Sequence, residues 1–304
     1  MDIGRIERAW SAGFFDGEGW AGTSGRGVFA QINQADPDGV PEVLLRFQRA
    51  VGVGRLGGPV LEEGKEPLYR WVVSSRADVM SAFEAIAPWL GEVKRNDFAE
   101  TLGISGPASE WESVALDERT AWAAGLFDGE GWTGLEKHRS HKGRSVLAMA
   151  VTQASELAAP EVLVRLRDVL GGGHIYGPYR GARLPVYRWK QHVEGSIRAS
   201  VVALSPYLNS RKRIQADNAI AVVDRQPKLG RGNPTWGAYK THCVNGHEYA
   251  TARIRPYRAR KAGGTRRRNS KQCLACSREQ AQARRDASGK IRSGAKPSSR
   301  STRD

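Results

Sequence analysis

The sequence is poor in cysteine and has no long hydrophobic run. Three cysteines in 304 residues are too few for a fold held by disulfides, so a reducing compartment is expected. No stretch of about 18 consecutive apolar residues occurs, and the N-terminus lacks the basic and apolar regions of a signal peptide. These absences exclude a transmembrane helix. They predict an intracellular protein without a membrane partner, cytoplasmic or associated with the nucleoid.

Length and charge point to several domains and a polyanionic partner. At about 100–200 residues per domain, a chain of 304 residues predicts two or three domains. Residues 1–227 contain 27 Lys and Arg against 28 Asp and Glu, whereas residues 228–304 contain 20 against 4. A near-neutral body with a cationic tail is typical of nucleic-acid-binding proteins. A disordered solubilising tail is the alternative.

The body of the chain is an internal repeat. The string AWSAGFFDGEGW at residues 9–20 recurs as AWAAGLFDGEGW at residues 121–132. Likewise, PLYRW at 67–71 recurs as PVYRW at 185–189. The parts keep their order, which indicates that one unit of roughly 110 residues has been duplicated.

Both units have the same predicted order of elements. In the first unit we expect a helix over 7–16, strands over 20–24 and 28–35, a helix over 42–51, strands over 55–61 and 68–74, and helices over 77–90 and 92–102. In the second unit we expect a helix over 118–128, strands over 132–137 and 145–154, a helix over 160–170, strands over 174–179 and 186–192, and helices over 194–208 and 210–223. Adjacent strand pairs with helices on one side predict the α+β class, as two pseudo-symmetric αββαββα units. Each unit would carry an antiparallel sheet with one open face.

The domain boundaries follow from these units and from shifts in composition. We expect a first unit at 1–103, a linker at 104–117, a second unit at 118–227, a linker at 228–240, a zinc-binding basic module at 241–280 and a basic, disordered tail at 281–304.

The repeated motif carries the acids best suited to chemistry. Small residues, Gly13 and Gly125 among them, would let the two motif helices approach closely. Each helix would end in Asp-Gly-Glu-Gly, where glycine permits a left-handed C-terminus. Carboxylates are unfavourable at the negative end of a helix dipole, so cations between two such ends would be stabilising. Mg²⁺ prefers oxygen ligands and could act on a scissile phosphate there. A duplicated capping motif with solvated acids is the alternative.

SAGFFDGEG (11–19) and AAGLFDGEG (123–131) resemble the two motifs of the single-chain LAGLIDADG homing endonucleases. The resemblance covers residues 5–225. It is strengthened by the duplication, by the order of elements, and by APWL at 87–90 and SPYL at 205–208, each followed by basic residues. It implies two sheets that form a saddle over duplex DNA. A two-stranded ribbon does fit a major groove.

The resemblance also implies roles for particular residues. Many family members have Asp, and some Glu, at the positions of Glu18 and Glu130, which would bind the catalytic divalent metal. The earlier acids of the motif would support its end, and a glutamine and a lysine of each unit would assist at the active site. These residues are Asp16 and Asp128, Gln34 and Gln153, and Lys94 and Lys212.

Residues that read DNA are expected on the predicted strands and just after them. The resemblance points to basic residues near the end of the fourth strand of each unit, Arg76 and Lys190. The other candidates are Gln31, Asn33, Arg55, Arg70, Lys137, His174, Tyr176 and Arg188.

The tail holds a four-ligand pattern. Cys243-x3-His247 and Cys273-x2-Cys276 offer ligands that suit tetrahedral Zn²⁺, and they resemble a small zinc-binding module appended to phage and mobile-element nucleases. His242 is a rival ligand, and three cysteines without metal are the alternative reading. Basic residues between the two pairs would neutralise phosphates and make binding depend on salt; they include Arg253, Arg255, Arg258, Arg266, Arg267 and Arg268.

We therefore expect a Mg²⁺-dependent, site-specific double-strand DNA endonuclease of the homing type. It would act as a monomer with internal pseudo-twofold symmetry on a long site, and a phage or mobile element would be a plausible source. An RNA-binding intron maturase and a nuclease-dead DNA-binding regulator on the same scaffold are the alternatives. Two intact acids favour the nuclease over the regulator.

Overall fold

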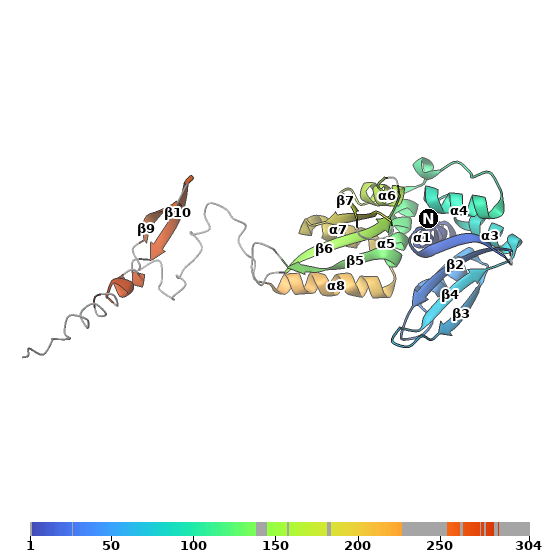
Figure 1. Cartoon of the computed structure of the whole chain (residues 1–304), viewed down its shortest axis with the longest axis horizontal. Coiled ribbons are helices and arrows are strands. Elements are labelled where there is room, and N and C mark those ends of the chain that lie inside the picture. Colours follow the sequence, from blue (N-terminus) through green and yellow to red (C-terminus); the bar gives the residue numbers. More distant parts are fainter. Residues whose placement is uncertain are drawn as a thin grey trace, which may run out of the picture. The chain divides into compact units, whose positions relative to one another are not determined.

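The two repeats of the body have the same succession of helices and strands in the computed structural model (Figure 1). The structure describes residues 2–25, 27–137, 145–156, 158–180, 184–226, 254–261, 264–273, 275–276, 278–282 and 285, and for 254–272 the backbone alone. The chain divides into two units, Met1–Gln226 and Pro227–Asp304.

Each half of the first unit contains four strands between helices. The first half consists of α1 (Ile3–Glu18), β1 (Gly19–Ser24), β2 (Gly27–Ala35), α2 (Glu42–Val51), β3 (Arg55–Val60), β4 (Leu68–Val73), α3 (Arg76–Ile86) and α4 (Glu92–Leu102). The second half consists of α5 (Leu116–Glu130), β5 (Gly131–Lys137), β6 (Ser145–Ala154), α6 (Glu161–Val169), β7 (His174–Tyr179), β8 (Val186–Gln191), α7 (Glu194–Leu204) and α8 (Ser210–Arg225). The predicted α+β class with two pseudo-symmetric units is confirmed. Each half of the first unit ends in two helices, so the full order of elements in a half is αββαββαα.

The two sheets are antiparallel and have the same topology. The strand orders are β1-β2-β4-β3 and β5-β6-β8-β7, which place the strand that follows each motif helix at a sheet edge. Alternation along β4 explains the one-sided burial, because Tyr69, Trp71 and Val73 are buried while Arg70 between them is exposed. The helices pack on the buried side, and the other face of each sheet is left open.

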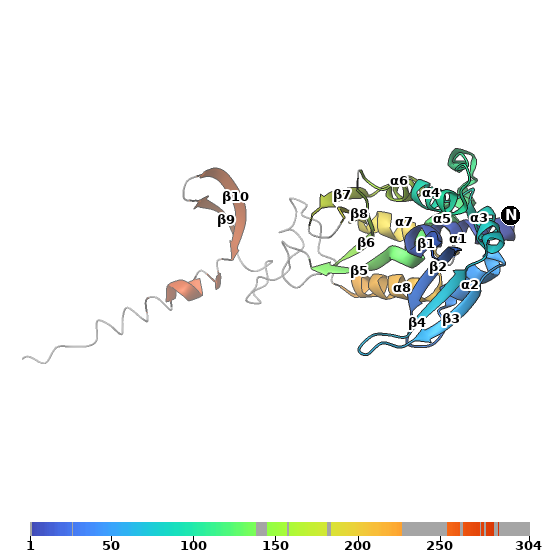
Figure 2. The same cartoon turned by 45° about the vertical axis from the view of Figure 1, so that its right-hand side comes forward.

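The motif helices α1 and α5 lie side by side between the two sheets (Figure 2). Their contact is close enough to exclude side chains at two glycines. A Cβ on Gly13 would lie 1.9 Å from the carbonyl oxygen of Trp122, and one on Gly125 would lie 1.9 Å from that of Trp10. The predicted close approach of the two helices is therefore confirmed at both copies.

The prediction of a left-handed C-terminus for the motif helices is wrong. Gly19 has φ −80° and ψ 153°, and Gly131 has φ −78° and ψ 148°, so the chain passes directly from helix into extended strand. Glycine is needed there for space. A Cβ on either residue would lie 2.3 Å from the ring of Phe15 or Phe127, respectively.

The segment between the halves takes part in the core. It contains a short 3-10 helix, η1 (Trp111–Ser113), and both Trp111 and Val114 are buried. The Trp111 ring packs edge-on against Trp122 at 4.9 Å, and the guanidinium of Arg165 lies 4.4 Å from its centroid. The connection thus fills the space beside α5.

The second unit contains an antiparallel hairpin of β9 (Ile254–Lys261) and β10 (Gly264–Cys273). Cys273 ends β10 and is buried, and Cys276 lies in the helical turn that follows. Cys243, His247 and Arg253 lie outside the described residues, as do the side chains of Arg255, Arg258, Arg266, Arg267 and Arg268. Within the part of the chain that the structure describes, no cluster of three or more metal-ligating side chains is found, and no helix is long and apolar enough to span a membrane.

Candidate metal and nucleic-acid site

At the C-terminal ends of the motif helices, the side chains of two glutamates each reach toward the opposite helix. Glu18 ends α1 and Glu130 ends α5. Each packs against a glycine of the opposite motif, because a Cβ on Gly129 would lie 2.9 Å from Cγ of Glu18, and one on Gly17 would lie 3.2 Å from Cγ of Glu130. The glycines of the two motifs therefore provide the space in which the two acids lie together.

The environment of this pair disfavours two negative charges. Burial raises the pKa of the Glu130 carboxyl to about 7, and the charge of Glu18 adds to the shift. Burial also raises the pKa of Glu18, against a hydrogen bond from Gln34 and the positive charge of Lys212. Among the described residues, no side chain donates a hydrogen bond to Glu130. Two half-buried carboxylates with so few donors fit a divalent cation that takes oxygen ligands.

Two lysines face the acids from the helices that follow the sheets. Lys212 in α8 donates a hydrogen bond to the carbonyl oxygen of Gly131, at the negative end of α5. Burial lowers the pKa of Lys212, while Asp128, Glu18 and Glu130 oppose that shift. In α4, the Nζ atom of Lys94 lies 3.7 Å from Oδ2 of Asp97. The positive charge of Lys94 also lowers the pKa of Glu130. The structure thus brings both predicted lysines toward the acids.

The two glutamines of the motif region occupy equivalent positions but differ in bonding. Gln34 pairs with Tyr69 and Gln153 pairs with Tyr187 in the strand register. Gln34 lies close enough to Glu18 to lower the pKa of that carboxyl, whereas the buried Nε2 of Gln153 has no hydrogen-bond partner among the described residues. A buried donor without an acceptor is costly, so the two halves of the site are chemically unequal.

The motif aspartates connect the two halves. Asp16 accepts hydrogen bonds from the indole Nε1 of Trp122 at 2.8 Å and from the backbone N–H of Gly91, which precedes α4. Asp128 accepts the same pair of bonds from Trp10 Nε1 at 2.8 Å and from the N–H of Asn209, which precedes α8. Each aspartate, though near the negative end of its own helix, therefore lies at the positive end of another.

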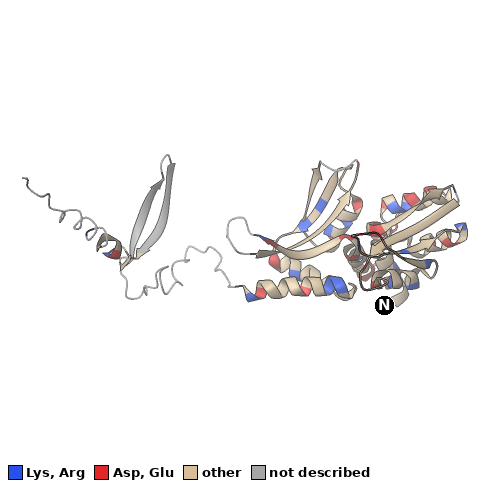
Figure 3. Cartoon of the chain, turned by 60° about the horizontal axis from the view of Figure 1, so that its bottom comes forward, with Lys and Arg blue, Asp and Glu red and all other residues tan. Residues whose placement is uncertain are grey.

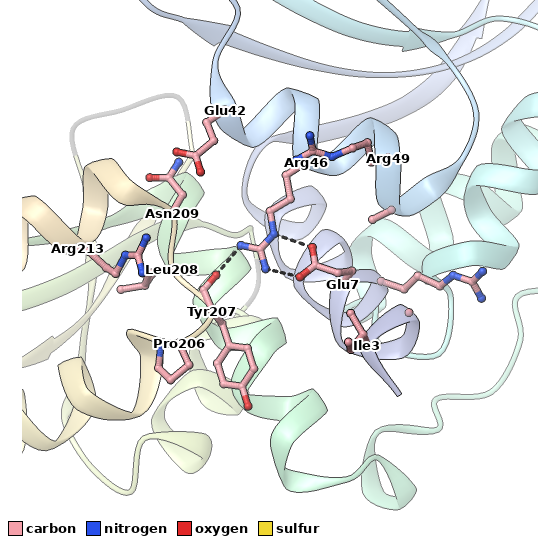
Figure 4. Close-up of a pocket in the computed structure, with 13 residues that line it drawn as sticks. Ile3, Glu7, Glu42, Arg46, Arg49, Pro206, Tyr207, Leu208, Asn209 and Arg213 are labelled. Carbon is pink, nitrogen blue, oxygen red and sulfur yellow. Dashed lines mark hydrogen bonds and ion pairs between the residues drawn. The ribbon is translucent and has the colours of Figure 1, made fainter. Parts of the chain in front are cut away.

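A reciprocal arginine clamp also holds the two halves together. Arg46 of α2 donates to both carboxylate oxygens of Glu7, at 2.7 and 2.9 Å, and to the carbonyl oxygen of Tyr207 in the second half (Figure 4). Arg165 of α6, its counterpart, donates to the carbonyl oxygen of Trp89 at 3.0 Å. The cavity drawn in Figure 4 therefore belongs to this interface, and eleven residues of helix, about 16 Å, separate Glu7 from Glu18.

A second cleft lies beside the acids. It has a volume of about 460 Å³, and its lining includes Gln34, Gly129 and Lys212. Neither glutamate lines the cleft, but Gln34 and Lys212 of its lining both act on Glu18, so the cleft adjoins the acid pair. We therefore place the chemically relevant opening here, and not at the cavity of Figure 4.

Strand register divides the predicted DNA-reading residues. Directly opposed residues share a face, so the pairs Asn33–Arg70 and Tyr176–Arg188 lie on the open faces. The Asn33 and Arg70 side chains are bonded at 2.8 Å. The open faces also carry Gln31, Arg55, His174 and Lys190. Acidic and basic positions are interspersed over the body (Figure 3), and Lys190 is itself paired with Glu136.

Two of the predicted residues lie elsewhere. Lys137 is opposite Ser145, on the side of the sheet that alternates with the open face. Arg76 is the first residue of α3, beyond the end of β4, and donates to the carbonyl oxygen of Leu102. In the register of β4 and β8, the position equivalent to Lys190 is Val72.

The residues not foreseen are aromatic or belong to the clamp. The repeat shows Trp10 and Trp122 at matching places, yet composition and spacing do not reveal that their indoles bond the opposite aspartates. The same holds for Arg46 and Arg165, whose partners lie across the halves. Matching positions in the two repeats were the available signal.

No protein-family model and no curated protein matches this chain. Solved structures do match it. The LAGLIDADG meganuclease I-AabMI, solved bound to uncleaved DNA, is 14% identical, with a TM-score of 0.53 over 71% of this chain and 90% of that one. The LAGLIDADG homing endonuclease I-GzeII, solved with its DNA target, is 13% identical, with a TM-score of 0.50 over 71% of this chain and 89% of that one. At these identities the similarity establishes that the chain has the fold of the two-domain LAGLIDADG proteins.

Proposed function

We propose that this protein is a single-chain LAGLIDADG homing endonuclease that cuts both strands of a specific DNA site. The observation that carries the proposal is the crossing of Glu18 and Glu130, each packed against the glycine of the opposite motif. The acid of each half would take part in cleavage of one of the two DNA strands. The fold shared with two nucleases solved on DNA supports the same conclusion.

The acid pair would hold the divalent cations. Bound there, Mg²⁺ would supply Lewis-acid stabilisation of the phosphate oxygens and a more acidic water. The chain's own residues prepare that site: Gln34 orients Glu18, and burial keeps bulk water from screening the charges. Lys212 and Lys94 place positive charge beside the position where a phosphate would gain negative charge.

The open faces of the two sheets would bind the duplex. A two-stranded antiparallel ribbon fits the major groove of B-DNA, and each half offers polar side chains on such a surface. Asn33 and Arg70 are bonded to each other on the first sheet. Arg188 donates to Thr152 at 3.2 Å on the second. Such pairs would present donors and acceptors to base edges in fixed positions.

The test is break mapping. The full-length protein is incubated with Mg²⁺ and DNA from its source, and new ends are sequenced. We expect discrete double-strand breaks at one long site, absent from the Glu18→Gln/Glu130→Gln variant. Glu84→Gln, which removes an exposed acid of α3, is the matched control and should cut like wild type.

The other outcomes discriminate among alternatives. Breaks that persist in the double glutamine variant would overturn the site assignment. Specific DNA binding without breaks by the wild-type protein would identify a regulator on the same scaffold. Binding of structured RNA in preference to duplex DNA would identify a maturase.

We propose further that the second unit carries a structural zinc ion. Cys273 and Cys276, at the end of β10 and in the following turn, would supply two ligands, and Cys243 and His247 would supply the others. Metal analysis of the purified protein should find one Zn²⁺ per chain, lost in Cys273→Ser/Cys276→Ser. A wild-type protein without zinc would contradict this.

A further inference from the structure

An exposed tryptophan follows the acid motif in both halves. Trp20 in β1 is 51% exposed and Trp132 in β5 is 36% exposed, whereas the six other tryptophans of the described residues are buried. Neither ring belongs to the buried core. Their recurrence at the same position in both repeats indicates a role at the surface.

Each of these rings packs over the glycine two residues later in its own strand. A Cβ on Gly22 would lie 3.3 Å from the Trp20 indole, and one on Gly134 would lie 2.3 Å from that of Trp132. The Phe29 ring also packs edge-on against Trp20, with centroids 4.6 Å apart. Both indoles therefore pack on their own strands before any ligand binds, and Trp20 also packs on Phe29. Such packing reduces the conformational entropy lost on contact.

The strand register places both rings on the open faces. Trp20 is opposite Gln31, and Trp132 is opposite Ala150, which is also opposite Lys190. Each tryptophan follows its motif glutamate by two residues, about 7 Å of chain. Because α1 and α5 end side by side, the two rings lie close to the junction between the halves.

We propose that Trp20 and Trp132 form a paired aromatic wedge that contacts the central base pairs of the DNA site through the minor groove. This inference rests on the proposed function. If the two sheets enter major grooves one helical turn apart, the groove that faces the junction between them is the minor groove. Apolar side chains pressed into a minor groove partly unstack base steps and kink the duplex.

The wedge would make the centre of the site selective without hydrogen bonds to bases. Pyrimidine–purine steps unstack most easily, so sites with such steps at the centre would bind best. The outer positions would be read separately by the polar residues of the strands.

The test is selection of binding sites from a random-sequence duplex library. The Glu18→Gln/Glu130→Gln protein serves as the parent, so that bound DNA stays intact. It is compared with derivatives that add Trp20→Ala/Trp132→Ala or Trp20→Phe/Trp132→Phe. The matched control adds Val93→Ala/Val202→Ala, which trims two exposed apolar side chains on helices.

The parent should select a long site with flexible central steps. The alanine derivative should lose the central preference and bind that site about tenfold more weakly, which is about 1.4 kcal/mol, because base–aromatic stacking is lost. It should keep the outer preferences. Phenylalanine should restore most of both, and the valine control should match the parent.

A second readout follows the DNA itself. 2-Aminopurine placed at the central step should brighten when the parent binds, and should not when the alanine derivative binds. An unchanged central preference and an unchanged rise in fluorescence would overturn the wedge alone, as would an equal loss at every position. Failure of the parent to select any site would overturn the proposed function as well.

Discussion

The indole of Trp122 donates a hydrogen bond of 2.8 Å to Asp16, and Trp10 donates one of 2.8 Å to Asp128. Each bond crosses from one motif helix to the other. Each aspartate also accepts the N–H group that begins α4 or α8. The aspartates of the two motifs therefore fix the interface, and the function proposed above assigns metal binding to the glutamates two residues later.

Removal of this cross-bond should destabilise the whole body. Asp16→Ala leaves a buried indole N–H and a buried backbone N–H without an acceptor, so we expect a loss on the order of 3 kcal/mol in the free energy of unfolding. Trp122→Phe keeps most of the ring and should cost less. Urea denaturation measures both, with Asp217→Ala, an exposed acid of α8, as the control. A double-mutant cycle between Asp16 and Trp122 that shows no coupling would refute the assigned role.

The helix crossing should reject any side chain at its two glycines. Gly13→Ala would place a methyl group 1.9 Å from the carbonyl oxygen of Trp122, and only a shift of a whole helix relieves such a contact. We expect a loss of about 3 kcal/mol or an insoluble protein. Gly195→Ala, in α7 where a Cβ meets nothing within 4 Å, should instead raise stability slightly. Equal thermal melting of the two variants would contradict the close crossing.

Features that depend on neighbouring residues could be predicted from the sequence, whereas features that depend on distant residues could not. The duplication revealed the repeat order and the two matching sets of strands, because a repeated motif can be recognised locally along the chain. The Glu18 and Glu130 pair follows from motif symmetry. Trp111 was assigned to a polar linker, since its neighbours are polar and its burial depends on Arg165 and Trp122 from elsewhere. Which faces Lys137 and Arg76 occupy likewise depends on register and on strand ends, which spacing alone leaves open.

The Glu130 carboxyl should make the metal-free protein less stable at alkaline pH. Its pKa is about 7 in the folded protein and near 4.3 in an unfolded chain. A raised acid pKa means that the favourable contribution is complete below the unfolded value and is lost as pH rises through about 7. In EDTA, the stability of Glu130→Gln relative to wild type should therefore increase by about 2 kcal/mol between pH 5 and pH 8. Mg²⁺ at pH 8 should stabilise wild type more than the variant.

Thermal melting across that pH range is the measurement. The exposed-acid variant Glu84→Gln should track wild type at every pH. If Glu130→Gln and wild type differ by a constant amount from pH 5 to pH 8, the acid does not titrate in this range.

The tail should supply most of the salt dependence of DNA binding. Residues 228–304 contain 20 Lys and Arg against 4 Asp and Glu, whereas the body is almost neutral. The logarithm of the binding constant falls with the logarithm of salt concentration by about 0.9 for each phosphate neutralised. The chain truncated after Gln226 should bind more weakly and with a shallower slope. An unchanged slope in fluorescence anisotropy titrations would mean that the tail does not contact DNA.

The unequal glutamines should make the two strands of the DNA respond differently to mutation. The hydrogen bond from Gln34 lowers the pKa of Glu18, so Gln34→Ala should raise that pKa and move the acid limb of cleavage to higher pH for the strand served by Glu18. Gln153 has no partner for its buried Nε2 among the described residues, and Gln153→Ala removes an unsatisfied donor at no loss of a bond. Gln153→Ala should therefore leave the pH dependence of cleavage of the other DNA strand unchanged. Nicking of each strand, followed against pH on a duplex labelled at both ends, separates the two, and equal shifts from both variants would show that the halves of the site are equivalent in solution.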